Sequence, residues 1–359
     1  MVKGLIKMGS FYDSNTYLQD LNVALSHTVE IEELKNCKIL ITGATGTIGS
    51  FIVDMLLYFN EVYNANITIY IAGRNVLKMK ARFSCMNDTQ LIYMEYDARD
   101  VIRFEVNVDY IIHAAGNAHP SAFNGDPVGT IMENISGTYN LLKLGKNCNA
   151  KRMLYISSGE IYGQGDLSLE SFEESYAGYM DTMLSRACYP ISKRAAENLC
   201  ASYTKQYALE TVIVRPCHTY GPGMTETDSR AHAQFIRNVL KNENVVLKSA
   251  GNQMRSYNYV ADCASAILSV LIKGKTGEAY NIANPNIRIT IAQLAKAVAE
   301  QAGKEVVFEN PSESDLENRT PIAKQVLNTK KLENLGWKAA FTIDEGIKDT
   351  LCILKEIEK

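Results

Sequence analysis

The stretch ILITGATGTIGS, residues 39–50, constrains the fold of this chain more than any other feature. The apolar run before its glycines is typical of a buried strand, and FIVDMLLYF after them is typical of a helix. Strand, glycine turn and helix in this order can form a dinucleotide site. Gly43 would allow the tight turn, Gly46 would let the backbone approach a pyrophosphate, and Gly49 would let the helix pack on the strand. The alternative is an ordinary glycine-rich turn in an α/β protein.

Strand and helix patterns alternate along the chain after this turn, as far as Pro216. The predicted strands are ITIYIAGRN, LIYMEYDARD, VDYIIHAAG, RMLYISSGEIYG and ETVIVRP, and helical patterns near 75–85, 127–148 and 189–207 lie among them. This alternation predicts the α/β class with a parallel, doubly wound sheet, whose ligands bind at the carboxyl edge of the strands. The predicted organisation is a helical arm over 1–36, a cofactor domain over 37–216 to which 256–282 returns, and a smaller substrate lobe that is mainly 217–359.

Composition narrows the class of protein. Of the 359 residues, 46% are hydrophobic and 21% are charged, which are ordinary values for a globular protein. The net charge of −3 gives no general attraction to nucleic acid or to an anionic membrane. No apolar run approaches the ~20 residues of a membrane span. The eight cysteines include no Cys-x-x-Cys pair, so we predict no metal site and buried thiols in a soluble, cytoplasmic protein.

Tyr189 and Lys193 in YPISK form the main candidate for chemistry. Four residues apart on a helix, they share one face. Pro190 suits a first helical turn, so the tyrosine should lie near the positive end of the helix dipole with an ammonium close by. Both effects would lower the tyrosine pKa and make the phenol a usable base for an alcohol proton. The alternative is a surface Tyr and Lys that happen to have this spacing.

Several further motifs occur in order along the chain: TGATGTIG, HAAG at 113–116, Asn134 in ENISGTYNLL, SSGEIYG at 157–163, YPISK, VRPCHTYGPG, RSYNYVAD and LGW. With them the chain resembles an extended short-chain dehydrogenase/reductase of the NAD-dependent epimerase/dehydratase family, nearest to its UDP-glucuronate decarboxylase branch. The resemblance covers about residue 37 to the end. It implies a Rossmann domain with a nucleotide-sugar lobe, NAD or NADP as cofactor, transient oxidation of sugar C4, and a homodimer formed through two helices of each subunit.

The resemblance also implies catalytic roles for four residues. Ser158 matches the residue that hydrogen-bonds the sugar O4, and Tyr189 the base that takes its proton. Lys193 matches the residue that binds the nicotinamide ribose and lowers the tyrosine pKa. Glu160 matches a glutamate of the dehydratase and decarboxylase branches, although a solvated carboxylate is the alternative. Gly159 stands where the 4,6-dehydratases carry an acidic residue, which disfavours dehydration.

The cofactor contacts implied by the glycine turn and the resemblance are Gly43, Thr45, Gly46, Thr47, Ile48, Gly49, Arg74, Asp97, Ala98, Ala114, Ala115, Tyr189 and Lys193. NAD enzymes usually end the second strand with an acidic residue for the ribose 2′-hydroxyl, whereas here that turn reads Gly73, Arg74, Asn75. Arg74 could accept a 2′-phosphate or stack on the adenine. The choice between NAD and NADP therefore stays open.

The substrate contacts implied by the resemblance are His119, Asn134, Arg186, His218, Arg255 and Arg319. Arg186 and the block around Arg255 most resemble the decarboxylases, and Arg255 should meet the diphosphate. Lys248 and His218 depart from the usual pattern, which leaves the nucleotide base open. A decarboxylase acting on UDP-glucuronate is the leading interpretation. The alternatives are a 4-epimerase, a 4,6-dehydratase, a 4-ketosugar reductase, or a cofactor-binding regulator that has lost the chemistry.

Overall fold

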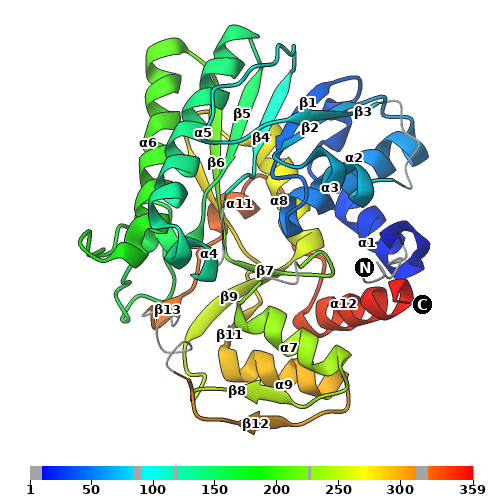
Figure 1. Ribbon diagram of the computed structural model, residues 1–359, viewed down its shortest axis with the longest axis vertical. Coiled ribbons are helices and arrows are strands. Elements are labelled where there is room, and N and C mark those ends of the chain that lie inside the picture. Colours follow the sequence, from blue (N-terminus) through cyan, green and yellow to red (C-terminus); the bar gives the residue numbers. More distant parts are fainter. Residues whose placement is uncertain are drawn as a thin grey trace, which may run out of the picture.

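The computed structural model describes residues 10–84, 90–116, 118, 120–224, 228–312 and 322–358. Its centre is a seven-stranded parallel sheet with the order β10-β6-β5-β4-β1-β2-β3 (Figure 1). The strands are β1 Lys38–Thr42, β2 Thr68–Gly73, β3 Leu91–Glu95, β4 Tyr110–His113, β5 Arg152–Ile156, β6 Thr211–Pro216 and β10 Ala279–Ile282. The order reverses between β1 and β4, which is where a doubly wound sheet opens a crevice for ligands. The predicted α/β Rossmann class is confirmed.

Helices cover both faces of this sheet, as a parallel sheet requires. Helices α5 Pro127–Asn147 and α6 Cys188–Tyr207 pack together on one face, where they bury Leu40 of β1. Helices α2 Thr47–Tyr63 and α8 Val260–Lys273 cover the other face, where they bury Ile39 and Ile41 (Figure 1). Because both faces are buried, the sequence of β1 is a continuous apolar run. That run is the pattern from which this strand was predicted.

The N-terminal arm packs on its own chain, a point that the sequence left open. Its helix α1 Asn15–Ser26, which Ser14 caps, contacts α2, α8 and α12 Ile343–Ile357 (Figure 1). The buried carboxylate of Asp54 in α2 accepts hydrogen bonds from the hydroxyls of Tyr12 and Tyr17 and from the guanidinium of Arg82. Two of these three donors come from the arm, so the buried charge keeps its full set of partners only while the arm is in place.

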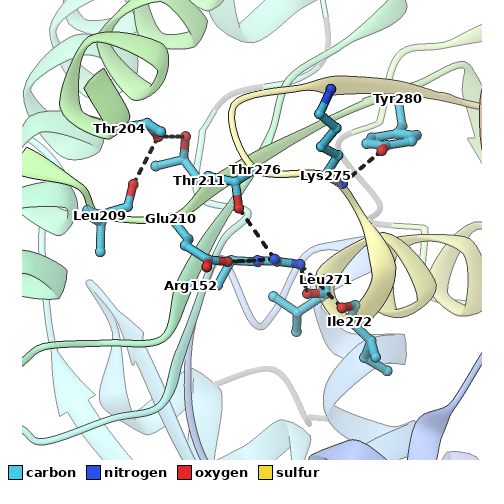
Figure 2. Close-up of polar contacts among 10 residues, drawn as sticks. All are labelled: Arg152, Thr204, Leu209, Glu210, Thr211, Leu271, Ile272, Lys275, Thr276 and Tyr280. Carbon is cyan, nitrogen blue, oxygen red and sulfur yellow. Dashed lines mark hydrogen bonds and ion pairs between the residues drawn. The ribbon is translucent and has the colours of Figure 1, made fainter. Parts of the chain in front are cut away.

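Arg152, at the start of β5, holds α8 to the edge of the sheet opposite the ligand crevice. Its Nη1 donates to the carbonyl oxygens of Leu271 and Ile272 at 3.0 and 3.3 Å, and its Nη2 donates to Glu210 at 2.6 Å (Figure 2). A cation suits the last turn of a helix, whose carbonyls have no partner within the helix.

A smaller lobe lies beyond the carboxyl ends of the strands (Figure 1). In it β9 Met254–Tyr259 pairs with β7 His218–Tyr220, β11 Arg288–Thr290 and β13 Lys324–Gln325, while β8 Val245–Leu247 pairs with β12 Val306–Phe308. Four shorter helices complete this description: α3 Val76–Arg82, α4 Pro120–Gly125, α7 Ala231–Leu240 and α9 Ile291–Gln301. The predicted domain limits stay a prediction.

Two predicted elements differ from the structure. The strand expected over 152–163 ends at Ile156, and Gly159–Tyr162 forms a short 3-10 turn that begins at Ser158. Helix α4 Pro120–Gly125 forms between the strand predicted as VDYIIHAAG and the helix predicted over 127–148, where the sequence predicted no helix. Among the described helices, none has the length and apolar character needed to cross a membrane.

Candidate active site

A cavity of about 410 Å³ lies at the carboxyl edge of the sheet, between it and the smaller lobe. Every residue predicted to contact the cofactor lines it, as do all four predicted catalytic residues. These lining residues include Gly43, Thr45, Gly46, Thr47, Ile48, Gly49, Arg74, Asp97, Ala98, Ala114, Ala115, Ser158, Glu160, Tyr189, Lys193 and His218. The sheet order brings these segments together because β1, β2, β4, β5 and β6 all end at this edge.

The glycine turn between β1 and α2 has the geometry that its sequence predicts. Gly43 has φ +71°, and a Cβ there would lie 2.5 Å from the backbone of Ala114. A Cβ at Gly49 would lie 2.3 Å from the carbonyl oxygen of Gly43. At Gly46, however, the nearest protein atom to a Cβ would be 3.5 Å away, so packing within the protein does not require glycine there. Gly46 begins α2 without a side-chain cap, and the residues therefore fit a phosphate group bound at this helix start.

Ser158, Tyr189 and Lys193 come together at the floor of the cavity. Tyr189 is the second residue of α6, and its side chain is hydrogen-bonded with Ser158. The Ser158 hydroxyl also accepts a hydrogen bond from the Glu160 backbone N–H at 3.1 Å. The Lys193 ammonium lies 5.8 Å from the centroid of the Tyr189 ring and donates to the carbonyl oxygen of Ile156 at 2.9 Å.

Burial controls the ionisation of this group. It raises the pKa of Tyr189 to about 12, and the negative charge of Glu160 adds to the rise while the bond from Ser158 opposes it. Burial also lowers the pKa of Lys193 to about 8. The prediction that Tyr189 has a lowered pKa is therefore wrong for this structure. The reason is that Lys193 donates to the Ile156 carbonyl, and that burial of the phenolate outweighs the groups that lower the pKa, which are Ser158, Arg230 and Arg186.

Glu160 and Arg186 form an ion pair beside the tyrosine. The Arg186 Nη1 atom lies 3.1 Å from Glu160 Oε2, and both side chains are largely buried. The guanidinium carbon also lies 5.0 Å from the ring centroid of Phe123 in α4. That ring stacks on Tyr189 with centroids 5.0 Å apart and planes at 11°. Glu160 is thus a paired carboxylate at the cavity, and Phe123 is a neighbour that the sequence pattern did not identify.

Arg230 is a second residue that sequence reasoning missed. It lines the cavity beside His218, and its guanidinium is fixed by Asp228, with Nη2 to Oδ2 at 2.6 Å and Nε to Oδ1 at 2.9 Å. Asp228 fixes the position of the Arg230 guanidinium and leaves its Nη1 edge able to bind a ligand. The only available signal was the Asp-Ser-Arg order shortly after the Gly-Pro-Gly turn.

Three predicted substrate contacts lie elsewhere. Arg255 is 1% exposed and donates to the backbone carbonyls of Met254, at 2.9 Å, and Ile322. Asn134 is fully buried and donates to the Ser192 hydroxyl at 2.9 Å, which ties α5 to α6. Neither of them, nor Arg186, is among the described residues that line the cavity. His119 and Arg319 lie outside the described residues.

In the described part of the chain, no group of three or more His, Cys, Asp or Glu side chains is placed to hold a metal ion.

Comparison with known proteins gives relatives along most of the chain. Residues 39–283 match the NAD dependent epimerase/dehydratase family. UDP-glucuronic acid decarboxylase 5 of Arabidopsis thaliana is 32% identical over 317 residues, which is 87% of this chain and 87% of the relative. UDP-glucuronic acid decarboxylase 1 of Xenopus tropicalis is 30% identical over 331 residues, which is 91% of this chain and 75% of the relative.

Solved structures share the fold. A dTDP-glucose 4,6-dehydratase from Streptomyces venezuelae with NAD bound superposes with a TM-score of 0.76 at 23% identity, over 89% of this chain and 97% of the other. A UDP-glucuronic acid 4-epimerase from Bacillus cereus, in complex with UDP-glucuronic acid and NAD, gives 0.74 at 20% identity, over 89% and 99%. The family match covers more than half of the chain and agrees with the glycine turn and the Ser, Tyr and Lys cluster, so this chain belongs to the NAD dependent epimerase/dehydratase family.

Proposed function

We propose that this chain is an enzyme that transiently oxidises C4 of a nucleotide sugar with a bound nicotinamide cofactor, and that it decarboxylates UDP-glucuronate. The observation that carries the proposal is that Ser158, Glu160, Tyr189 and Lys193 line the same cavity as the phosphate-binding glycine turn. A regulator without chemistry would have no need of this cluster. The relatives named UDP-glucuronic acid decarboxylase support the choice of reaction.

The glycine turn would hold the cofactor pyrophosphate at the start of α2, and Lys193 would hold the nicotinamide ribose. When bound, the nicotinamide supplies a reversible hydride acceptor for the sugar carbon. The residues of the chain must then bind the substrate, orient it, and move the proton of its hydroxyl.

Proton transfer at the O4 hydroxyl falls to Tyr189. Ser158, which is hydrogen-bonded with Tyr189, would share the O4 hydroxyl and direct its proton toward the phenol oxygen. With a pKa of about 12, the Tyr189 phenol is almost fully protonated at neutral pH, so it needs a nearby cation to give up its proton and act as the base. The Lys193 ammonium, 5.8 Å from the ring, is placed to give that help when it turns from the Ile156 carbonyl toward the phenol oxygen.

Glu160 and Arg186 would support decarboxylation at C5, the carbon next to C4. With C4 at the ketone level, a C6 carboxylate belongs to a β-keto acid. The C5–C6 bond then breaks, carbon dioxide leaves, and the electron pair passes into an enolate, which takes a proton from water at C5. Return of the hydride to C4 and of the proton from Tyr189 to O4 would restore the hydroxyl. A lone Glu160 carboxylate would repel the C6 carboxylate. Its pairing with Arg186 at 3.1 Å neutralises that charge.

Gly159 favours this reaction over dehydration. A Cβ there would lie 3.3 Å from Leu327 and 3.4 Å from the carbonyl oxygen of Pro216, so the acidic residue of a dehydratase has little room. A 4-epimerase is the second candidate, because Ser158, Tyr189 and Lys193 serve it equally well. It needs no carboxylate at the position of Glu160.

We propose that Arg230 contacts the substrate diphosphate, in place of the predicted Arg255. Its fork lines the cavity, whereas Arg255 is committed to two backbone carbonyls. Arg230→Ala should raise KM at least ~10-fold, since one charge-assisted hydrogen bond is lost.

We also propose a cytoplasmic homodimer. Helices α5 and α6 lie side by side and expose apolar side chains on α5, of which Val128 is 71%, Met132 47% and Tyr139 46% exposed. Such a surface suits a second copy of the chain. Of the seven cysteines that the structure describes, all are free and five are buried, which suits a reducing compartment.

The reaction is tested by offering purified protein a panel of UDP- and dTDP-linked sugars with NAD and NADP, and by following the products with mass spectrometry. The proposal expects UDP-glucuronate to lose the mass of carbon dioxide. Conversion of an uncharged UDP-hexose alone, without a change of mass, would favour the epimerase.

A further inference from the structure

The adenosine end of the cavity lacks the carboxylate that NAD enzymes usually carry at the end of the second strand. The end of β2 and the turn after it read Ala72, Gly73, Arg74 and Asn75. A Cβ on Gly73 would lie 3.2 Å from the sulfur of Met79, which is 2% exposed in α3, so a longer side chain there would press on a buried residue. The family that the chain matches is nevertheless NAD dependent. A different element is therefore needed to accept hydrogen bonds from the hydroxyls of the adenosine ribose.

Glu133, in the second turn of α5, brings a carboxylate to this end of the cavity. It is a lining residue, and its side chain is 8% exposed. Its Oε1 atom lies 3.4 Å from Nη1 of Arg74, the residue that directly follows β2. The carboxylate from α5 therefore lies beside the turn in which the usual acidic residue would stand.

The Glu133 carboxylate has acceptor capacity to spare. An ionised carboxylate can accept about four hydrogen bonds, yet among the described residues Arg74 alone donates to Glu133, at 3.4 Å. Burial raises the pKa of Glu133, and the positive charges of Arg74 and Arg99 oppose that rise. A buried carboxylate with one long hydrogen bond is stabilised by further donors, and a ribose diol offers two hydroxyls.

Asp97, the other carboxylate at this end of the cavity, already has strong partners. Arg99 holds it with Nη2 to Oδ2 at 2.9 Å and Nε to Oδ1 at 3.1 Å, and the Arg99 backbone N–H donates to Oδ1 at 2.9 Å. A carboxylate in a bidentate pair offers less to a ribose hydroxyl than one with a single long hydrogen bond. Glu133 is therefore the better acceptor of the two.

The same charges disfavour a phosphate group on the ribose. Arg74 and Lys78 also line this end, and by themselves they would suit a phosphate. Arg74 is paired with Glu133, however, and a 2′-phosphate would have to approach the carboxylates of both Glu133 and Asp97. Like charges repel more strongly where water is excluded, and the Glu133 side chain is largely shielded from water.

We propose that Glu133 selects NAD over NADP. Its carboxylate accepts hydrogen bonds from the hydroxyls of the adenosine ribose, in place of the carboxylate that β2 lacks, and it repels the 2′-phosphate of NADP. The proposal rests on the proposed function, which requires a nicotinamide cofactor, and it names the residue of this chain that selects the form of that cofactor.

The test is isothermal titration calorimetry of the full chain with NAD, NADP, ADP and 2′-deoxy-ADP. The last two differ only in the 2′-hydroxyl, and they lack the nicotinamide. NAD should bind at least ~10-fold more tightly than NADP, and ADP about 10-fold more tightly than 2′-deoxy-ADP, because a hydrogen bond to a charged acceptor is lost with the hydroxyl. This comparison uses the wild-type chain, so it does not depend on the folding of a variant.

Glu133→Gln keeps the size of the side chain and removes its charge. It should weaken NAD binding by ~10-fold, reduce the ratio of NAD to NADP affinity by at least ~10-fold, and reduce the ratio of ADP to 2′-deoxy-ADP affinity by at least ~3-fold. The matched control is Glu95→Gln, the same substitution at the exposed end of β3, at a residue that is not among the described lining residues. The control should change neither ratio, and thermal unfolding should show that both variants are folded.

Three results would overturn the selection of NAD by Glu133 and leave the proposed function intact. They are an unchanged ratio of NAD to NADP affinity in folded Glu133→Gln protein, equal binding of ADP and 2′-deoxy-ADP by the wild-type chain, and tighter binding of NADP than of NAD. Failure of the wild-type chain to bind either dinucleotide would instead contradict the proposed function itself.

Discussion

Replacing Tyr189 by phenylalanine removes a single oxygen from the centre of the proposed site. The ring remains, so its stacking on Phe123, with centroids 5.0 Å apart, should be kept. The hydroxyl's hydrogen bond with Ser158 is lost, at a net cost of about 0.5–1.5 kcal/mol in unfolding free energy. Loss of a general base costs ~100-fold to ~10,000-fold in turnover, or roughly 3–5 kcal/mol in the barrier. The catalytic effect should therefore exceed the effect on stability.

Three measurements on Tyr189→Phe separate these effects: product formation by mass spectrometry, cofactor affinity by calorimetry, and thermal unfolding. We expect cofactor affinity within about threefold of wild type, since the hydroxyl carries one hydrogen bond at most. Tyr203→Phe is the matched control, because Tyr203 lies on the same helix and packs against Tyr139 and Tyr207 away from the cavity. A Tyr189→Phe enzyme with more than about a tenth of wild-type turnover would refute the assignment, as would an equal loss in Tyr203→Phe.

Three further predictions follow from buried or crowded groups. Burial lowers the pKa of Lys193 to about 8, so its ammonium is present below that pH and lost above it. The turnover rate should therefore fall as pH rises through 8, and Lys193→Arg should move this fall in the pH–rate profile to higher pH. In Gly43→Ala, a Cβ at φ +71° would lie 2.5 Å from the Ala114 backbone, so calorimetry should show that NAD binding is lost while a folded protein remains soluble. In Asp54→Ala, the ion pair between the fully buried Asp54 and the largely buried Arg82 is broken, and urea unfolding should show a loss of about 3–5 kcal/mol, against little change for a substitution of the exposed Glu61. An unchanged midpoint would contradict the proposed anchoring of the N-terminal arm.

Local spacing was enough to predict the parts of the site that a single element carries. The glycine turn needs only a strand, three glycines and a helix, and Tyr189 and Lys193 share a face because they are four residues apart on α6. Such relations follow from helix and turn geometry and survive any arrangement of the remaining chain.

Relations between elements were harder to predict. Phe123 reaches Tyr189 only because α4 folds back over the start of α6, and Arg230 reaches the cavity through a turn after β7. Arg255 carried a strong motif, yet its guanidinium is satisfied by two carbonyls. The pKa of Tyr189 depends on how much water the completed fold excludes from its side chain. The position of the residue on its helix does not predict this degree of burial.

The central claim is that Glu160 and Arg186 support chemistry at C5 of a UDP-hexuronate after C4 is oxidised. The most direct test is to incubate the purified enzyme with UDP-glucuronate and cofactor in deuterium oxide, and to locate deuterium in the product by NMR and mass spectrometry. We predict a UDP-pentose with one deuterium at C5 and release of carbon dioxide, and Glu160→Gln should suppress this product more than it suppresses the first reduction of the cofactor. A hexuronate inverted at C4, with its carboxylate retained and no solvent deuterium, would contradict the account and identify a 4-epimerase.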